Sequence, residues 1–144
     1  MINPHDGVLT FDQPPLRIAP TLTRSEFLAA SWSKPSTDWI LNAPWCSWKL
    51  DFECRSTSVS FIVVFYFHDE RLAMIEMSNA DAKFGTSWDD YSLEKELQRD
   101  QTHIAWLTEC LGPERSFTWG TVRTGGYDDP HGGGGASIQI RYAG

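Results

Sequence analysis

The sequence predicts an α+β fold, in which a twisted antiparallel sheet of about five to seven strands packs against one long helix and one short helix. Two stretches carry this prediction. Residues 58–77 contain the densest apolar run of the chain, and residues 93–111 repeat their leucines with a helical period. The chain has 144 residues, of which 41% are hydrophobic. We therefore expect residues 1–144 to form a single domain.

The apolar run at 58–77 predicts a central hairpin. Alternate residues of its first strand point to opposite faces of a sheet. One face receives Val59, Phe61, Val63, Phe65 and Phe67, and the other receives Ile62, Val64 and Tyr66. Residues 68–71 have the polar composition and the length of a hairpin connection, and residues 72–77 form the returning strand. Both faces of this hairpin are apolar, so both need to be covered.

The first 31 residues predict two short strands and a short helix. Residues 7–11 and 16–19 are apolar pieces on either side of Pro14 and Pro15, which force a turn. Thr23 and Glu26 have the spacing of a capping box, in which each side chain accepts a hydrogen bond from the other residue's backbone N–H. The helix therefore runs from about residue 24 to residue 31.

Residues 32–48 are rich in tryptophan, proline and serine. The prolines predict an ordered but irregular loop. Its indoles could cover one edge of the core, or some of them, such as Trp45 and Trp48, could form an aromatic patch for a partner. Residues 49–54 then alternate between apolar and charged positions. We expect them to form a strand beside the central hairpin, with Leu50, Phe52 and Cys54 on its buried face.

The main helix is predicted over residues 93–111. Ser87, Asp89 and Asp90 precede it and offer a cap with carboxylates near a helix N-terminus, and Gly112 and Pro113 stop it. Its apolar residues fall three, four or seven positions apart on one stripe: Leu93, Leu97, Ile104, Leu107 and Leu111. We expect this stripe to pack on the sheet, with joint burial of Phe61, Val63, Phe65, Leu97, Ile104 and Leu107.

Two further strands are predicted at the end of the chain, over residues 117–123 and 137–142. Residues 124–136 between them are rich in glycine, which predicts a tight turn or a mobile loop. This loop lacks the order of a phosphate-binding motif and precedes a strand, where a phosphate site needs a helix. Asp128, Asp129 and His131 could together hold a divalent ion, but an Asp-, Gly- and Pro-rich hairpin tip explains them more economically. The sequence therefore predicts neither a metal nor a cofactor.

The sequence also lacks a pattern that predicts catalysis. His103 and Cys110 share one side of the main helix, but seven residues put them about 10 Å apart, too far for a hydrogen bond. The other histidines fall in predicted turns or loops without an accompanying nucleophile motif. We therefore predict no catalytic residue.

The charge balance narrows the classes of partner. The net charge is -7, with 12 basic residues scattered among 19 acidic ones, which argues against nucleic acid and favours a basic protein partner. The three cysteines are odd in number and lack metal-ligand spacing, as in reduced thiols of the cytoplasm. The sequence begins without a secretory signal pattern, and its apolar run is too short to cross a membrane as a helix. We expect a cytoplasmic protein that binds no membrane.

Residues 119–142, read with LTRSEFLAAS at 22–31, resemble a group of small proteobacterial proteins without assigned function. Several such acidic α+β proteins look like immunity proteins, which bind a toxin and block it. The resemblance implies a non-enzymatic inhibitor of a basic toxin or effector protein. The candidate contact residues are Trp45, Trp48, Asp89, Asp90, Tyr127, Asp128, Asp129 and His131. The alternative is a small enzyme or ligand-binding protein, with a pocket between sheet and helix near the Gly-rich segment.

Overall fold

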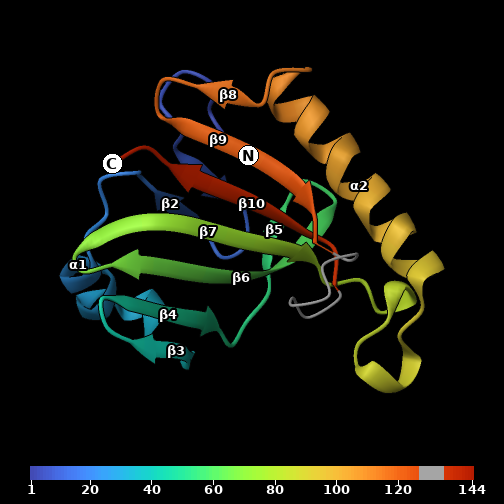
Figure 1. Ribbon diagram of the computed structural model, residues 1–144, viewed down its shortest axis with the longest axis horizontal. Helices are drawn as coiled ribbons and strands as arrows, with labels where there is room; N and C mark the ends of the chain where they lie inside the picture. Colours follow the sequence, from blue (N-terminus) through green and yellow to red (C-terminus); the bar gives the residue numbers. More distant parts are fainter. Residues whose placement is uncertain (127–134) are drawn as a thin grey trace.

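The computed structural model describes residues 1–126 and 135–144, and these residues form an α+β structure (Figure 1). Its main sheet is antiparallel and has eight strands, more than predicted. These are β3 (Ser36–Asn42), β4 (Trp45–Leu50), β5 (Cys54–Ser56), β6 (Val59–His68), β7 (Arg71–Asn79), β8 (Ser116–Phe117), β9 (Gly120–Gly125) and β10 (Ser137–Tyr142). Their order is β3-β4-β6-β7-β10-β9-β8, with β5 also paired to β6.

The central hairpin is β6 and β7, as predicted. Its register places Phe65 opposite Ile75 and Val63 opposite Met77, and all four side chains are fully buried. Phe61 and Phe67 of β6 and Leu72 of β7 belong to the same core, and the neighbouring strands β4 and β10 add Trp48, Leu50, Ile138 and Ile140. The core of the protein therefore lies on one face of the sheet.

The N-terminal segment covers this core face. Strands β1 (Leu9–Phe11) and β2 (Leu16–Ile18) form a separate two-stranded sheet, and α1 (Arg24–Ala29) begins with the predicted capping box at Thr23. Both lie behind the main sheet in Figure 1. The ring of Phe27 lies 4.9 Å from that of Phe65, centroid to centroid. This aromatic contact joins α1 to the middle of β6.

The prediction of an irregular loop over residues 32–48 is wrong. A 3-10 turn, η1 (Ser31–Ser33), is followed by the hairpin of β3 and β4, which adds two strands to the sheet. Pro35 precedes β3 and Pro44 lies in the turn, so the prolines mark the ends of these strands and do not interrupt them. The prediction of one strand over residues 49–54 is also wrong, because β4 ends at Leu50 and β5 begins only at Cys54.

The last three strands form the other side of the sheet. The strand predicted at residues 117–123 is divided into β8 and β9, with Thr118 and Trp119 in the turn between them. Gly120 begins β9 at a φ of 155°, and a Cβ atom there would lie 2.0 Å from the carbonyl oxygen of Arg141 in β10. The close approach of the two backbones at this position therefore requires glycine.

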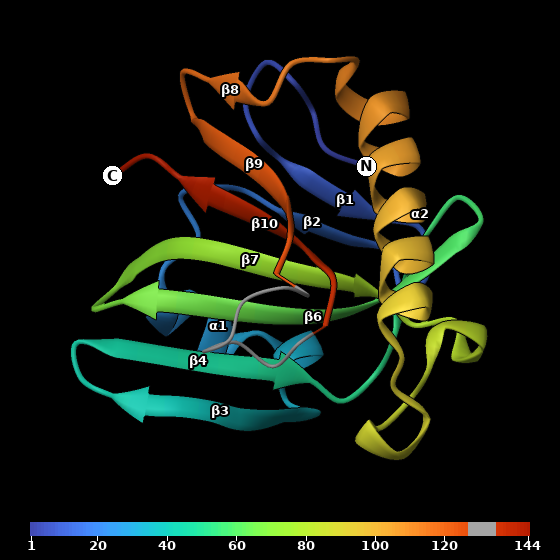
Figure 2. The same cartoon turned by 45° about the vertical axis from the view of Figure 1, so that its right-hand side comes forward.

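The long helix α2 (Leu93–Leu111) has the predicted bounds, and Leu107 and Leu111 of the predicted stripe are buried as expected, but the rest of the stripe is not. It runs past the ends of the sheet strands (Figures 1 and 2). The predicted contact residues Leu97 and Ile104 are 42% and 43% exposed, and Leu93 is exposed as well. The buried side chains of α2 are Glu96, His103, Trp106, Leu107 and Leu111. The centre of the buried face therefore lies roughly 70° around the helix axis from the centre of the predicted stripe.

Two contacts explain this difference. Trp106 packs edge-on against Phe61 at 5.0 Å, so the largest apolar side chain of α2 occupies the core contact that the leucine stripe was expected to make. Glu96 is buried next to Arg99, which compensates its charge. A helix can bury such polar residues once they are paired. The leucine pattern alone gives no information about this pairing. Within the described residues, no helix is long and apolar enough to cross a membrane.

Candidate functional site

An open cavity of about 540 Å³ lies at one end of the sheet, on the face opposite the core. Ile62 of β6 and Ser78 of β7, which pair across the hairpin, line it from the sheet. The connection between β7 and α2 and the first turns of α2 line a second side. The remaining lining residues include Trp39, Glu53, Phe84, Tyr91, Glu96, Arg99 and Gly135. The cavity thus combines aromatic walls with a few charged groups.

Trp39 reaches the cavity because of a bulge in β3. Asp38 pairs with Trp48 and Ile40 pairs with Ser47, so Trp39 is an extra residue between two consecutive ladder pairs. Its side chain is 55% exposed, the most of any large hydrophobic residue described. The ammonium group of Lys49 lies 5.9 Å from the centroid of its ring, a cation–π distance. Exposing an indole ring to water is unfavourable, and a binding role would explain why this one is exposed.

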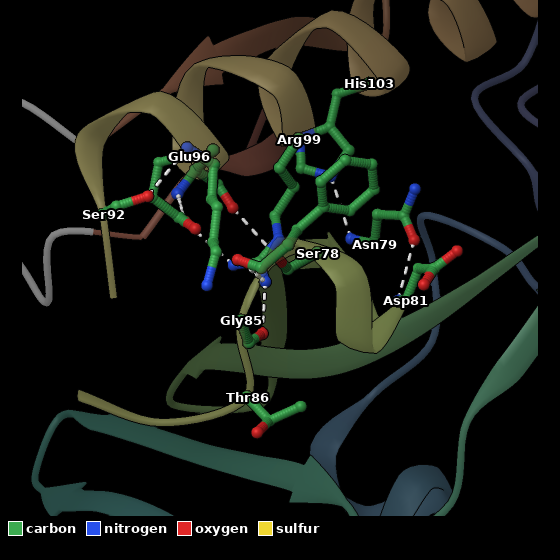
Figure 3. Close-up of polar contacts among 12 residues, drawn as sticks. Ser78, Asn79, Asp81, Gly85, Thr86, Ser92, Glu96, Arg99 and His103 are labelled. Atoms are coloured by element: carbon green, nitrogen blue, oxygen red, sulfur yellow. Dashed lines mark hydrogen bonds and ion pairs between the residues drawn. The ribbon is translucent and has the colours of Figure 1, made fainter. Parts of the chain in front are cut away.

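Glu96 and Arg99 form a buried ion pair at the base of the cavity (Figure 3). Their side chains are 3% and 12% exposed, and Nη1 of Arg99 lies 2.8 Å from Oε1 of Glu96. The same oxygen accepts a hydrogen bond from the backbone N–H of Ala136 at 2.8 Å. Nη2 of Arg99 donates to the carbonyl oxygens of Phe84 and Gly85, at 3.0 and 2.6 Å. We call this pair the brace, because it ties two separate chain segments to α2.

The connection between β7 and α2 is held by its own carboxylates. It contains η2 (Ala82–Phe84) and η3 (Trp88–Asp90). Asp81 caps η2 by accepting from the N–H of Lys83, and Asp90 accepts from the N–H groups of Thr86 and Ser87. These backbone N–H groups hold the pKa of Asp90 below its usual value. Ser92 is the N-cap of α2, so the prediction of a helix cap at residues 87–90 is wrong.

His103 is fully buried behind the brace, on the same face of α2. Its Nε2 accepts a hydrogen bond from the backbone N–H of Asn79 at 2.9 Å, which ties α2 to the end of β7 (Figure 3). Burial, together with the nearby Arg99 charge, lowers the pKa of His103 to about 4. His103 is therefore neutral at pH 7 and acts as a hydrogen-bond acceptor within the core.

A second polar cluster is centred on Glu76, two residues before Ser78 in β7 and on the same sheet face as the cavity. The carboxylate of Glu76 accepts from the hydroxyl groups of Ser137 and Tyr66, at 3.3 and 3.5 Å. Burial raises the pKa of Glu76 above its usual value. Burial and the neighbouring Glu76 carboxylate raise the pKa of Tyr66 to about 12. The hydrogen bonds of Glu76 thus link side chains of β6, β7 and β10 on the sheet face beside the cavity.

The structure places the predicted contact residues in different environments. Trp45 is exposed, with its ring 4.9 Å from that of His68, and Asp89 is exposed in η3. Trp48 is only 8% exposed and packs on Phe27 in the core, which removes it from the candidate contact surface. The carboxylate of Asp90 is occupied by the backbone N–H groups of its own loop. Tyr127, Asp128, Asp129 and His131 lie outside the described residues.

Sequence reasoning missed the brace, His103 and Trp39. Glu96, Arg99 and His103 are spaced by three and four positions, so they share one helix face. A polar stripe of this kind next to the apolar one was the signal that could have indicated a buried network. Trp39 had no comparable signal, because its position depends on a bulge in β3.

The polar groups of the cavity wall are largely engaged within the protein. The hydroxyl of Ser78 donates to the carbonyl oxygen of Ala136, and the amide of Asn79 donates to the hydroxyl of Thr102, both at 2.9 Å. Residues 1–126 and 135–144 contain no group of three side chains positioned to hold a metal ion. The groups of the site that remain available to a ligand or partner are therefore its exposed aromatic surface and the carboxylate of Glu53.

Fold and cavity together define an α+β protein with an open sheet face and an aromatic-walled hollow at one end of it. No family model, no curated protein and no solved structure matches the chain.

Proposed function

We propose that the protein is a non-enzymatic binding protein of the immunity type, which binds and neutralises a basic toxin or effector protein. The observation that carries the proposal is the gathering of three exposed apolar side chains, Trp39, Ile62 and Tyr91, around one cavity. Aromatic residues in a partly enclosed hollow are typical anchors of protein interfaces. The cavity is thus the centre of the proposed contact surface. Trp45, opposite His68 at the other end of β6, and Asp89 in η3 remain separate candidates.

The charge of the chain supports a basic partner. A net charge of -7 attracts a basic protein over several ångströms and speeds its association. Close to the cavity, Asp81 and Asp89 are exposed to solvent. Because salt screens such long-range attraction within about 8 Å at 0.15 M ionic strength, association should slow as salt rises.

The test co-expresses the protein with the product of the neighbouring open reading frame and measures growth of the host cell. We expect the second product to arrest growth alone and the protein to restore it through a purifiable complex. Trp39→Ala should weaken the complex about tenfold or more. Ile104→Ala is the matched control, since it removes exposed apolar surface outside the cavity. An arrest that the protein leaves unrelieved contradicts the proposal.

A second candidate function is that of a small enzyme or ligand-binding protein. The position of the cavity favours it, because the hollow lies between the sheet and α2 with Gly135 on its wall. Its volume of about 540 Å³ is in the range of ligand pockets. A metabolite that raises the melting temperature of the protein, but not that of Trp39→Ala, would support this function. Turnover of such a metabolite would replace the inhibitor proposal.

A further inference from the structure

The wall of the cavity carries one carboxylate that is not engaged elsewhere in the described structure. Glu53, in the segment between β4 and β5, is exposed and lines the cavity. Its side chain has no hydrogen bond or ion pair with any residue in 1–126 or 135–144. Glu96, the other acidic residue of the wall, is neutralised by Arg99. The described lining residues therefore carry one uncompensated charge, the carboxylate of Glu53; the Lys49 ammonium group, at the ring of Trp39, is not one of them.

The aromatic surface of the cavity suits a cationic group. The faces of indole and phenol rings attract cations through their quadrupoles. The ring of Trp39 already has the Lys49 ammonium group 5.9 Å from its centroid, and more than half of the side chain remains exposed. The ring of Tyr91 contributes a second wall.

The cavity is less suited to an anionic group than to a cationic one. Arg99 is the basic side chain among the described lining residues, and both of its Nη atoms already donate to Glu96, Phe84 or Gly85. An anion would have to break the brace or accept the repulsion of Glu53. Both effects oppose its binding.

We propose that the cavity receives a lysine or arginine side chain of the partner, held between the rings of Trp39 and Tyr91 and paired with the carboxylate of Glu53. This inference rests on the proposed function, and it specifies which chemical group of the basic partner enters the hollow. A long cationic side chain can place its methylene groups against the apolar floor at Ile62 and its charge near Glu53.

The first experiment uses small probes and the isolated protein. N-acetyl-arginine amide is titrated against the labelled protein, and N-acetyl-citrulline amide serves as the neutral probe of nearly the same shape. The indole N–H signal of Trp39 is identified from its loss in Trp39→Phe. We expect a saturable shift of this signal with the arginine probe, and binding of the citrulline probe about tenfold weaker.

Two variants locate the charge that makes the difference. Glu53→Gln should weaken binding of the arginine probe about fivefold and leave the citrulline probe unchanged. Glu94→Gln is the control, because Glu94 is an exposed carboxylate of α2 outside this cavity. Equal binding of the two probes, or an unchanged arginine affinity in Glu53→Gln, overturns the inference.

The co-expression assay separates this inference from the proposed function. If Trp39→Ala abolishes neutralisation while Glu53→Gln retains it fully, the partner binds at the cavity without a cationic anchor, and only the present inference is wrong. If the arginine probe binds as expected but the protein relieves no growth arrest, the cation site stands and the inhibitor function is wrong. Loss of neutralisation in both variants, with Glu94→Gln unaffected, supports both.

Discussion

Strand β6 presents large side chains to both faces of the sheet, and the two faces differ sharply in burial. Phe61, Val63 and Phe65 are fully buried on the core face, under α1, α2 and the β1–β2 hairpin. On the opposite face, Val64 is buried but Ile62 is exposed beside the cavity. The apolar pattern of β6 is similar on both faces. What differs is which elements pack against each face. An apolar strand face therefore predicts that something covers it, but it does not predict which element does so.

The largest expected effect tests the core face. Phe65→Ala should lower the free energy of unfolding by about 3–5 kcal/mol, because it leaves a cavity among tightly packed aromatic rings. Urea denaturation monitored by circular dichroism measures the loss. Ile62→Ala, on the other face of the same strand, should cost less than about 1 kcal/mol. Equal losses would show that the two faces are equally buried.

The brace supplies the next test. Arg99→Met should destabilise the protein by about 3 kcal/mol, because it leaves the carboxylate of Glu96 buried without its cation. The double variant Glu96→Gln, Arg99→Met should recover part of this loss, since the uncompensated charge is removed. A single variant as stable as the wild type would mean that the pair is solvated and does not hold the cavity walls.

His103 makes stability depend on pH. Its folded-state pKa of about 4 lies below the usual value of 6.5, so the unfolded chain binds more protons between these values. Stability should therefore fall as the pH falls from 6.5 to 4, by about 2–3 kcal/mol in total. The raised pKa of Glu76 gives a slope of the opposite sign. The contribution of His103 is thus measured as the difference between wild type and His103→Gln, and a difference independent of pH contradicts it.

The smallest effect is expected on the outer side of α2. Leu97→Ala should change the free energy of unfolding by less than about 0.5 kcal/mol, because Leu97 is exposed. Leu107→Ala, ten residues further along the same helix and fully buried, should cost about 2–5 kcal/mol. A large loss in Leu97→Ala would restore the packing that the leucine stripe predicted.

The sequence predicted elements better than it predicted their contacts. Strands β6 and β7, the capping box of α1 and the bounds of α2 follow from local patterns that depend on a few neighbouring residues. The face of α2 depends on Trp106 meeting Phe61 and on Arg99 compensating Glu96, which are tertiary contacts. Strands β3 and β4 were missed because their prolines lie at strand boundaries, where they are tolerated.

The candidate site was less accessible to sequence reasoning than the fold. The alternative of a pocket between sheet and helix has a counterpart in the cavity, but the residues that form it were not chosen. Trp39, Glu53 and Tyr91 are brought together from three separate segments by strand pairing and by the connection that precedes α2. Composition and residue spacing do not predict that these three residues come together, since none of them belongs to a recognisable pattern in its own segment.

The bulge that exposes Trp39 has a consequence for self-association. Strand β3 is the outermost strand on its side of the sheet, and an outer strand with a regular row of unpaired N–H and C=O groups invites pairing with another chain. The register shift between Asp38 and Ile40 interrupts that row near its middle. The same irregularity therefore lets the protein display an indole next to an open edge while making that edge a poor template for aggregation.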